Sequence, residues 1–328
     1  MDFKKITNNI IKVTLSLVLG GAILFWMYRG FNFHQIEDVM TNKMNWLWML
    51  LSFPFGIMAQ VFRGWRWKQT LEPMDEHPRL STAINSIFIS YAASLIIPRI
   101  GEFARCVILK RKDNISFPKA LGTVVTERAI DSLLVITITV IVFICQIPVF
   151  LNFFDKTGTS IDSIFGQFTT TGYFVTILCG ITIILLGHYL LKRLAIYDKV
   201  KATFSGIWQG VMSLKSIKNV PLFVFFTLAI WVSYFLHYYL TFFCFEATSS
   251  LGMTCAMVTF IVGSIAVIVP TPNGAGPWHF AVKTMLILYG VGSNDALYFV
   301  LIVHTVQTML VIILGIIAWL TLAFTKKR

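Results

Sequence analysis

Charged residues are scarce in this chain: only 13% of its 328 residues are Asp, Glu, Lys or Arg, whereas 56% are hydrophobic and 15% are aromatic. Soluble globular domains carry about 25% charged residues, and the mean hydropathy here is +0.75. The composition therefore excludes a soluble protein and predicts a membrane protein. The longest polar stretches, around 99–119 and 192–220, are too short to hold a soluble enzyme module with its own core.

Cysteine pairs and catalytic motifs are also missing. The five cysteines are odd in number, have no Cys-x-x-Cys spacing and lie in or beside apolar segments, which indicates small buried side chains rather than disulfides or a zinc site. No His-Glu-x-x-His, nucleophile elbow, Walker loop or Gly-x-Gly-x-x-Gly motif occurs. We therefore expect a protein that is not an enzyme and that needs no cofactor and no metal.

Long apolar runs are abundant. Six of them are long enough to cross about 30 Å of hydrocarbon as helices. They cover residues 10–28, 46–62, 120–147, 170–191, 221–245 and 295–324.

Two further apolar runs are interrupted. The run 81–97 ends at Pro98 and is followed by a short apolar piece, 103–109, whereas the run 252–269 ends in the Pro/Gly-rich segment 270–277. Each pattern is typical of a helix, a break and a second helix. Ordinary loops between short spans are the alternative.

The basic residues favour re-entrant hairpins. The chain has a formal net charge of +12, and cytoplasmic loops of membrane proteins collect Lys and Arg. If the first interrupted run enters and leaves by the cytoplasmic face, 22 of the 27 basic residues lie on that face, together with both termini. A full span there would move two clusters of six basic residues outside, so the sequence predicts a hairpin.

The two interrupted runs also suggest an internal symmetry. The first hairpin opens inward and the second opens outward, which is typical of an inverted-topology repeat. We therefore predict an all-α polytopic membrane protein with six spans and two re-entrant hairpins. It forms one domain whose half-repeats cover roughly 1–165 and 166–328.

Several ionisable side chains are expected at membrane depth. Glu127, Arg128 and Asp131 lie eight to twelve residues into a predicted helix that begins near Lys119. Arg128 can reach the first hairpin at Glu102 or in the neighbourhood of Arg99. Such groups are costly in hydrocarbon and usually pair or line a wet cavity. They could bind a charged headgroup, or they could be a structural ion-pair cluster that holds the hairpin to the helix.

Other candidates lie at the two breaks. Arg99 and Arg105 flank Glu102, and their guanidinium groups suit phosphate oxygens, although arginines at a hairpin tip can simply be interfacial anchors. His279 follows the second break, and His304 lies in the last span with Gln307 three residues on; these side chains could be functional or only structural.

These motifs carry a family resemblance. In order along the chain they are Arg66-Trp67, the segment 98–105 (PRIGEFAR), the segment 127–131 (ERAID) and the segment 270–276 (PTPNGAG). Together they resemble the flippase-like transmembrane region of lysylphosphatidylglycerol synthases, whose stand-alone members are multi-pass proteins of the bacterial inner membrane. The resemblance covers nearly the whole chain and implies movement of a lipid between leaflets, without synthase activity because the soluble synthase domain is absent.

Two positions depart from the family pattern. Many members carry a Glu soon after the third motif and an Arg in the last span, where this chain has His279 and His304. The resemblance therefore does not identify the lipid, the direction of movement or the energy source.

Taken together, the sequence predicts an inner-membrane protein that binds and translocates a lipid with an anionic or zwitterionic headgroup. Arg99, Arg105 and Arg128 would hold the phosphate, while Glu102, Glu127 and Asp131 would orient these cations or bind a cationic part of the headgroup. The break with Asn273, Gly274 and Gly276 would form the outer gate. The candidate binding residues are Arg99, Glu102, Arg105, Glu127, Arg128, Asp131, Asn273, Gly274, Gly276, His279, His304 and Gln307.

Two other functions stay open from the sequence. One is a non-transporting membrane subunit that supports a lipid-modifying or glycosyl-transfer enzyme, and the other is a membrane-embedded transferase. The expected partner is a membrane lipid and not a nucleic acid, because the basic residues flank apolar spans. A homo-oligomer or an enzyme partner in the membrane is compatible with the sequence.

Overall fold

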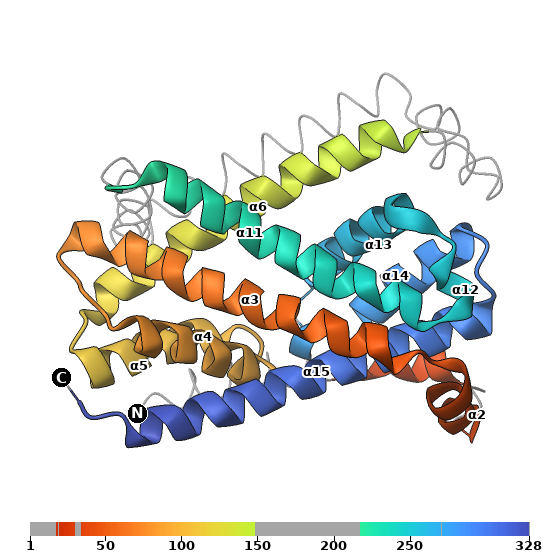
Figure 1. Ribbon diagram of the computed structural model, residues 1–328, viewed down its shortest axis with the longest axis horizontal. Helices are drawn as coiled ribbons and strands as arrows, with labels where there is room; N and C mark the ends of the chain where they lie inside the picture. Colours follow the sequence, from red (N-terminus) through yellow and green to blue (C-terminus); the bar gives the residue numbers. More distant parts are fainter. Residues whose placement is uncertain (1–17, 19, 30–33, 148–216, 270, 328) are drawn as a thin grey trace, which may run out of the picture. The chain divides into compact units, whose positions relative to one another are not determined.

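Helices dominate the described part of the chain, which in this computed structural model comprises residues 18, 20–29, 34–147, 217–269 and 271–327 (Figure 1). The chain divides into two units, and the first contains residues 1–138 and 213–328. Of the second unit, 139–212, the structure describes only residues 139–147.

No strand occurs among these residues. Residues 20–28 are helical, and the elements that follow, with the short π- and 3-10 helices marked η, are α2 (His34–Asp38), η1 (Val39–Lys43), α3 (Trp46–Leu71), η2 (Glu72–Met74), α4 (Leu80–Ser94), α5 (Ile100–Asp113), α6 (Phe117–Cys145), α11 (Val220–Tyr239), η4 (Leu240–Cys244), α12 (Glu246–Ser249), α13 (Gly252–Ala266), η5 (Pro272–Gly274), α14 (Pro277–Leu288) and α15 (Ser293–Phe324).

Four helical segments are long and apolar enough to cross a membrane: Trp46–Met74, Phe117–Cys145, Val220–Cys244 and Ser293–Phe324. They lie where four of the six spans were predicted, which confirms an all-α polytopic membrane protein. The predicted span 170–191 lies outside the described residues, and most of 10–28 does as well.

The second span is longer than predicted. The apolar run ends at residue 62, and the basic residues after it were assigned to the cytoplasmic face. In the structure α3 continues to Leu71, and Arg63 and Arg66 are buried in it at 2% and 0% exposure. The helix thus continues past the predicted end of the span, with these two arginines paired to buried carboxylates inside the protein; the face of the membrane to which they belong stays a prediction.

Each interrupted run forms two short helices joined by a break. The first forms α4 and α5, and the second forms α13 and α14. At 1.5 Å per residue, the 15 residues of α4 and of α13 span only about 22 Å, less than the hydrocarbon core. The two helices of each pair pack against each other.

Both pairs lie against α15 and approach its middle from opposite ends (Figure 1). Arg79, at the start of α4, donates a hydrogen bond over 3.1 Å to the carbonyl of Lys326 beyond the end of α15, and Ala92 near the end of α4 packs against Gly315. The second pair has its break beside His304 and Thr308, at the centre of α15. The second break thus lies at the centre of α15, and α4 of the first pair ends near Gly315, seven residues after Thr308.

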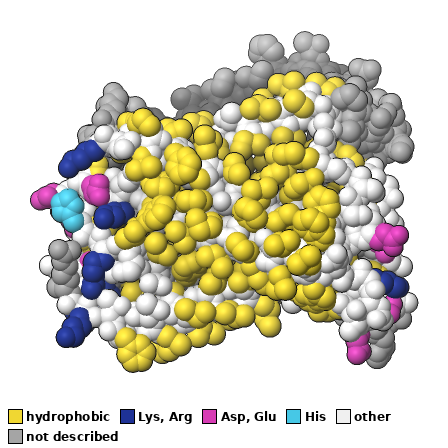
Figure 2. Space-filling model, in the orientation of Figure 1, with side chains coloured by type: hydrophobic (Ala, Val, Ile, Leu, Met, Phe, Trp, Pro, Cys, Tyr) yellow, Lys and Arg dark blue, Asp and Glu magenta, His cyan; other side chains and the backbone are white. Residues whose placement is uncertain are grey.

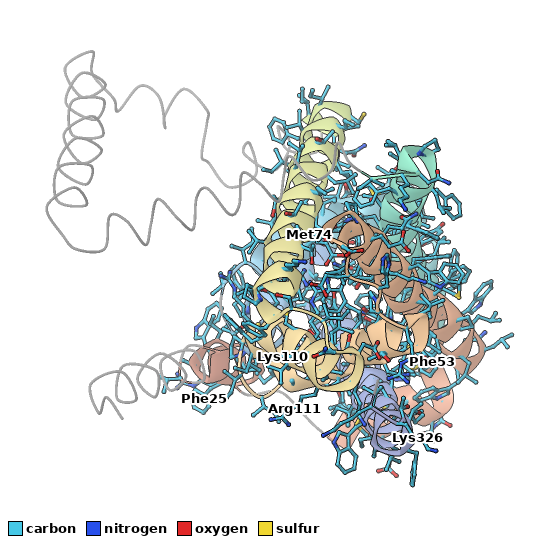
Figure 3. All side chains as sticks on the ribbon, turned by 90° about the vertical axis from the view of Figure 1, so that its left-hand side faces the viewer. Phe25, Phe53, Met74, Lys110, Arg111 and Lys326 are labelled. Atoms are coloured by element: carbon cyan, nitrogen blue, oxygen red, sulfur yellow. The ribbon has the colours of Figure 1, made fainter. Side chains whose placement is uncertain are left out.

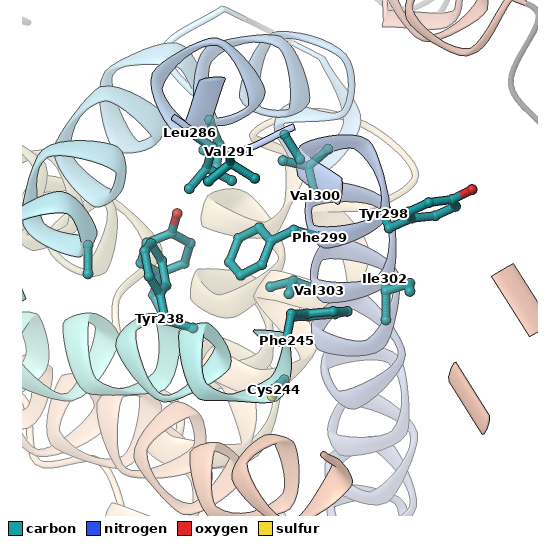
Figure 4. Close-up of a cluster of buried hydrophobic side chains, with 14 of the residues drawn as sticks. Tyr238, Cys244, Phe245, Leu286, Val291, Tyr298, Phe299, Val300, Ile302 and Val303 are labelled. Atoms are coloured by element: carbon teal, nitrogen blue, oxygen red, sulfur yellow. The ribbon is translucent and has the colours of Figure 1, made fainter. Parts of the chain in front are cut away.

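An apolar core holds the second pair to its neighbours. Phe299 of α15 points toward Tyr238 of α11, with ring centroids 6.2 Å apart, and packs among Val300, Val303 and Leu286 (Figure 4). Cys244 and Cys255 lie in this core. The four described cysteines are free as predicted; Cys106, Cys244 and Cys255 are buried, whereas Cys145 is exposed.

The surface of the first unit has two different ends. Hydrophobic side chains cover the middle of the face in Figure 2, with most Lys and Arg at one end and acidic groups prominent at the other. Figure 3 looks onto the basic end, where Lys110, Arg111 and Lys326 lie. A wide apolar belt between two polar ends is the surface expected of a membrane-spanning bundle.

Candidate functional site

Five buried charged side chains from α3, α5 and α6 form the arginine–carboxylate cluster: Arg63, Arg66, Arg105, Glu127 and Asp131. Asp131 lies between two arginines, since Arg63 Nη1 donates to its Oδ2 over 2.7 Å and Arg66 Nη1 lies 2.8 Å from its Oδ1. Arg63 and Arg66 are three residues apart on α3, so their side chains leave the same face of the helix.

Glu127 joins the hairpin helix α5 to this cluster. Its Oε2 accepts a hydrogen bond from Arg105 Nη2 over 2.9 Å, and its Oε1 lies 3.7 Å from Arg66 Nε. The Arg105 guanidinium carbon lies 4.4 Å from the centroid of the Trp67 ring, a cation–π contact. The Trp67 ring in turn donates to Thr123 over 2.9 Å. The Arg105 guanidinium is therefore held between the Glu127 carboxylate and the ring of Trp67.

Arg128 and Glu102 form a separate ion pair at the edge of this region, with Arg128 Nε 2.8 Å from Glu102 Oε1. Their side chains are 40% and 29% exposed, so this pair is half-buried. The prediction that Arg128 reaches Glu102 on the hairpin is therefore confirmed. Arg99 does not join either group: it is exposed in the break between α4 and α5, where its φ is 64°.

A second group of polar side chains, the histidine cluster, surrounds the other break: Asn273, His279, His304 and Thr308. Asn273 Nδ2 donates to Thr308 Oγ1 over 2.7 Å, and the His304 Nε2 donates to the Asn273 carbonyl over 3.1 Å. The rings of His279 and His304 lie 4.4 Å apart by their centroids. The structure thus brings both predicted histidines to the break.

Glycines give this break its shape. Gly274 and Gly276 have φ values of 71° and 92°, which side chains with a Cβ rarely adopt. A Cβ at Gly276 would also lie 2.9 Å from the carbonyl oxygen of Gly20. Asn273, with φ 52°, adopts the same left-handed region. The preceding Pro270 lies outside the described residues.

Polar side chains on α3, α11 and α15 lie between the two clusters. Next to the arginine–carboxylate cluster, two residues of α11 contact its arginines. Arg66 Nη1 donates to Thr227 over 3.4 Å, and the Arg63 guanidinium carbon lies 5.8 Å from the Tyr234 ring centroid. Gln60, one turn before Arg63, donates to the Tyr234 hydroxyl over 3.0 Å.

These polar side chains continue toward the histidine cluster. His237, on the next turn of α11, donates from Nδ1 to the Ser52 carbonyl of α3 over 2.8 Å. Gln307 donates from Nε2 to the His237 carbonyl over 3.3 Å, and Gln307 follows His304 by three residues on α15. We call this series the polar row; from one cluster to the other it contains Arg66, Thr227, Arg63, Tyr234, Gln60, His237, Gln307 and His304.

Sequence reasoning missed several of these residues. Arg63 and Gln60 were not among the candidates, and neither were Tyr234 and His237. A signal for Arg63 was present: it stands three residues before Arg66, and no proline occurs between residue 62 and Leu71. An extension of the second span would therefore place both arginines on one face. Within the described residues, no three His, Cys, Asp or Glu side chains lie close enough together to hold a metal ion.

Comparison with known proteins identifies the family. Comparisons with curated proteins and with solved structures find no match. The family described as "Lysylphosphatidylglycerol synthase TM region" matches residues 10–315, which is nearly the whole chain. This chain is therefore a multi-pass membrane protein that belongs to the family of the lysylphosphatidylglycerol synthase transmembrane region.

Proposed function

We propose that this protein binds a lipid with a charged headgroup and moves that headgroup between the two leaflets, without catalysing a chemical change in it. The observation that carries the proposal is the polar row, which lies between the buried arginine–carboxylate cluster and the partly exposed histidine cluster inside an otherwise apolar helical bundle. Polar and charged groups at such depth are costly and mark substrate pathways in membrane proteins. A headgroup that follows the row exchanges one set of polar contacts for the next.

The two breaks support the same function. A broken helix at membrane depth exposes backbone N–H and C=O groups that must be satisfied by protein, water or ligand. In this proposal α4–α5 and α13–α14 are re-entrant hairpins of an inverted repeat, and both lie against α15. Transporters with inverted repeats bind substrate near the bilayer midplane at such broken helices.

We assign the roles by position. Arg99, Arg105 and Arg128 hold the phosphate as the headgroup enters from the first hairpin, with Arg63 and Arg66 joining them from α3. Glu102, Glu127 and Asp131 orient these arginines, as their ion pairs indicate. The break 270–277 is the outer gate, and His279, His304 and Gln307 receive the headgroup there.

The distribution of charge supports a bacterial inner-membrane location. In the first unit, basic residues gather at the end that carries the start of α4 and the end of α15 (Figure 2). Because Lys and Arg accumulate on the cytoplasmic side, we place this end and both chain termini in the cytoplasm.

Reconstitution tests the proposed function. Purified protein is inserted into liposomes that contain a trace of phosphatidylglycerol with a fluorescent headgroup, and a membrane-impermeant reductant then bleaches the outer leaflet. Movement predicts that bleaching continues past the outer-leaflet half at a rate at least tenfold above protein-free liposomes. Bleaching that stops at one half would favour the alternative, a non-transporting subunit that supports a membrane enzyme.

A further inference from the structure

We propose that the arginine–carboxylate cluster binds the phosphate of a lipid headgroup that is a singly charged phosphodiester, and that it disfavours a headgroup that also carries an ammonium group. This inference rests on the proposed function and deepens it by naming the substrate class. Phosphatidylglycerol has such a headgroup, whereas phosphatidylcholine is a phosphodiester balanced by a quaternary ammonium.

The charge of the cluster is not balanced. Three arginines face two carboxylates, so the five side chains carry a net charge of +1. Each of the five is at most 5% exposed, and Arg66 and Glu127 are fully buried. The neighbouring pair of Arg128 and Glu102 is neutral by itself and leaves this count unchanged.

Arginine cannot remove this charge, because a guanidinium group does not lose its proton in proteins. An uncompensated charge that is buried costs several kcal/mol, and the cost falls when an anion occupies the site. One bound monoanion would bring the charge of the cluster to zero.

The hydrogen-bond donors of the cluster also exceed its acceptors. Arg63 Nε, Arg66 Nη2, Arg105 Nε and Arg105 Nη1 are buried and have no hydrogen-bond partner among the described residues. A phosphodiester has two non-bridging oxygens that share one negative charge and no donor on its phosphate, so it accepts from such nitrogens without supplying a competing proton. Guanidinium forks match this geometry with two parallel hydrogen bonds.

Every carboxylate oxygen of the cluster faces an arginine, although Glu127 Oε1 and Asp131 Oδ1 accept no hydrogen bond. Both oxygens of Asp131 lie within 2.8 Å of an arginine nitrogen, and both oxygens of Glu127 face arginines at 2.9 and 3.7 Å. An ammonium group brought into the cluster would meet arginines without a free carboxylate to compensate. The cluster therefore selects an anionic headgroup over a zwitterionic one.

Binding to the purified full-length protein in detergent tests the inference. The probes are dioleoyl phosphatidylglycerol and dioleoyl phosphatidylcholine, and the readout is the apparent affinity obtained from lipid-dependent thermal stabilisation. We expect the wild-type protein to bind phosphatidylglycerol at least tenfold more tightly than phosphatidylcholine. Equal affinities for the two lipids would overturn the inference.

Two variants and a matched control connect this preference to the cluster. Arg66→Gln makes the five positions neutral and should reduce the preference to less than twofold. Glu127→Gln raises the net charge to +2 and should tighten phosphatidylglycerol binding at least threefold, whereas a merely structural role predicts weaker binding. Arg111→Gln removes the same charge from an exposed position of α5 and should keep the tenfold preference.

A third probe, inorganic phosphate, separates a lipid from a free anion. If phosphate stabilises the wild-type protein as strongly as phosphatidylglycerol does, and Arg66→Gln abolishes both effects, the ligand is a free anion and the assignment to a lipid is wrong. The liposome assay is independent of this result. Lipid preference without movement would refute the proposed function alone, and movement without dependence on Arg66 would refute this inference alone.

Discussion

Asn273 donates a hydrogen bond to Thr308 over 2.7 Å, and this bond joins the break between α13 and α14 to the centre of α15. Because the Asn273 backbone adopts a left-handed conformation with φ 52°, the bond also holds the break in a shape that few residues adopt. The proposed outer gate is therefore held to the last span at Asn273, by this bond and by the one that His304 donates to the Asn273 carbonyl.

Breaking the bond between Asn273 and Thr308 should loosen the gate. Asn273→Ala and Thr308→Val are each expected to change the rate of lipid movement by about fivefold, and the double variant should differ little from either single one, since both remove the same interaction. The liposome assay measures all three. Thr321→Val is the control, because the hydroxyl of Thr321 bonds only within α15, to Ile317. Additive effects of the two substitutions would contradict the account.

Gly276→Val should abolish lipid movement while the protein still inserts. The side chain would need φ near 92° and would lie against the Gly20 carbonyl, whereas insertion depends on the apolar helices on either side. Membrane abundance and lipid movement are measured together. Gly122→Val, at a helical position with open space around it, should retain activity. Normal movement in Gly276→Val would remove this break from the pathway, and the same holds for Gly274→Val.

The half-buried ion pair of Arg128 and Glu102 predicts a charge-swap result. Arg128→Glu should slow lipid movement at least tenfold, because two carboxylates would then face each other at the hairpin. The double variant Glu102→Arg with Arg128→Glu should recover at least half of the rate. Arg128→Lys, which keeps the charge without the planar fork, should fold normally but move lipid poorly. A wild-type rate in both Arg128→Lys and Arg128→Glu would leave the pair only a structural role.

The buried ion pairs predict a large loss of stability. Asp131→Asn leaves Arg63 and Arg66 without their shared carboxylate, and the free energy of unfolding should fall by about 3–5 kcal/mol. Denaturant unfolding in detergent, in the absence of added lipid, measures this change. Asp38→Asn breaks the exposed pair with Lys43 and keeps an oxygen that can accept from Asn42, so it should leave stability unchanged within error. Equal effects in the two variants would contradict the importance of burial.

Much of the fold follows from local sequence patterns. Apolar length predicts the four described spans, and the prolines and glycines predict both breaks, because these features act within one segment. The boundary at Arg63 was wrong because its charge is neutralised by Asp131, which lies 68 residues further along the chain. Such a partner is visible only in three dimensions.

In the candidate site, too, some residues are recognisable from the local sequence and others only from the three-dimensional structure. Glu127, Arg128 and Asp131 could be recognised because charge inside an apolar run is conspicuous. Tyr234 and His237 could not, because aromatic residues are common in spans, and only the packing of α11 against α3 shows that they face Gln60 and Ser52. The inverted repeat stays a prediction, since residues 148–216 lie outside the described part.

The polar row is the central claim, and its middle is the most direct place to test it. Gln60→Leu combined with Tyr234→Phe removes the hydrogen bond between α3 and α11, together with the one that Tyr234 donates to Tyr91 of α4 over 3.0 Å. Neither substitution changes the charge, and both change the volume little. The rate of lipid movement into the outer leaflet of liposomes is measured for this variant and for Leu228→Phe, a control at an exposed apolar position of α11. The account predicts a rate at least tenfold below wild type for the double variant and a near-normal rate for the control; a wild-type rate in the double variant would show that the headgroup does not follow the polar row.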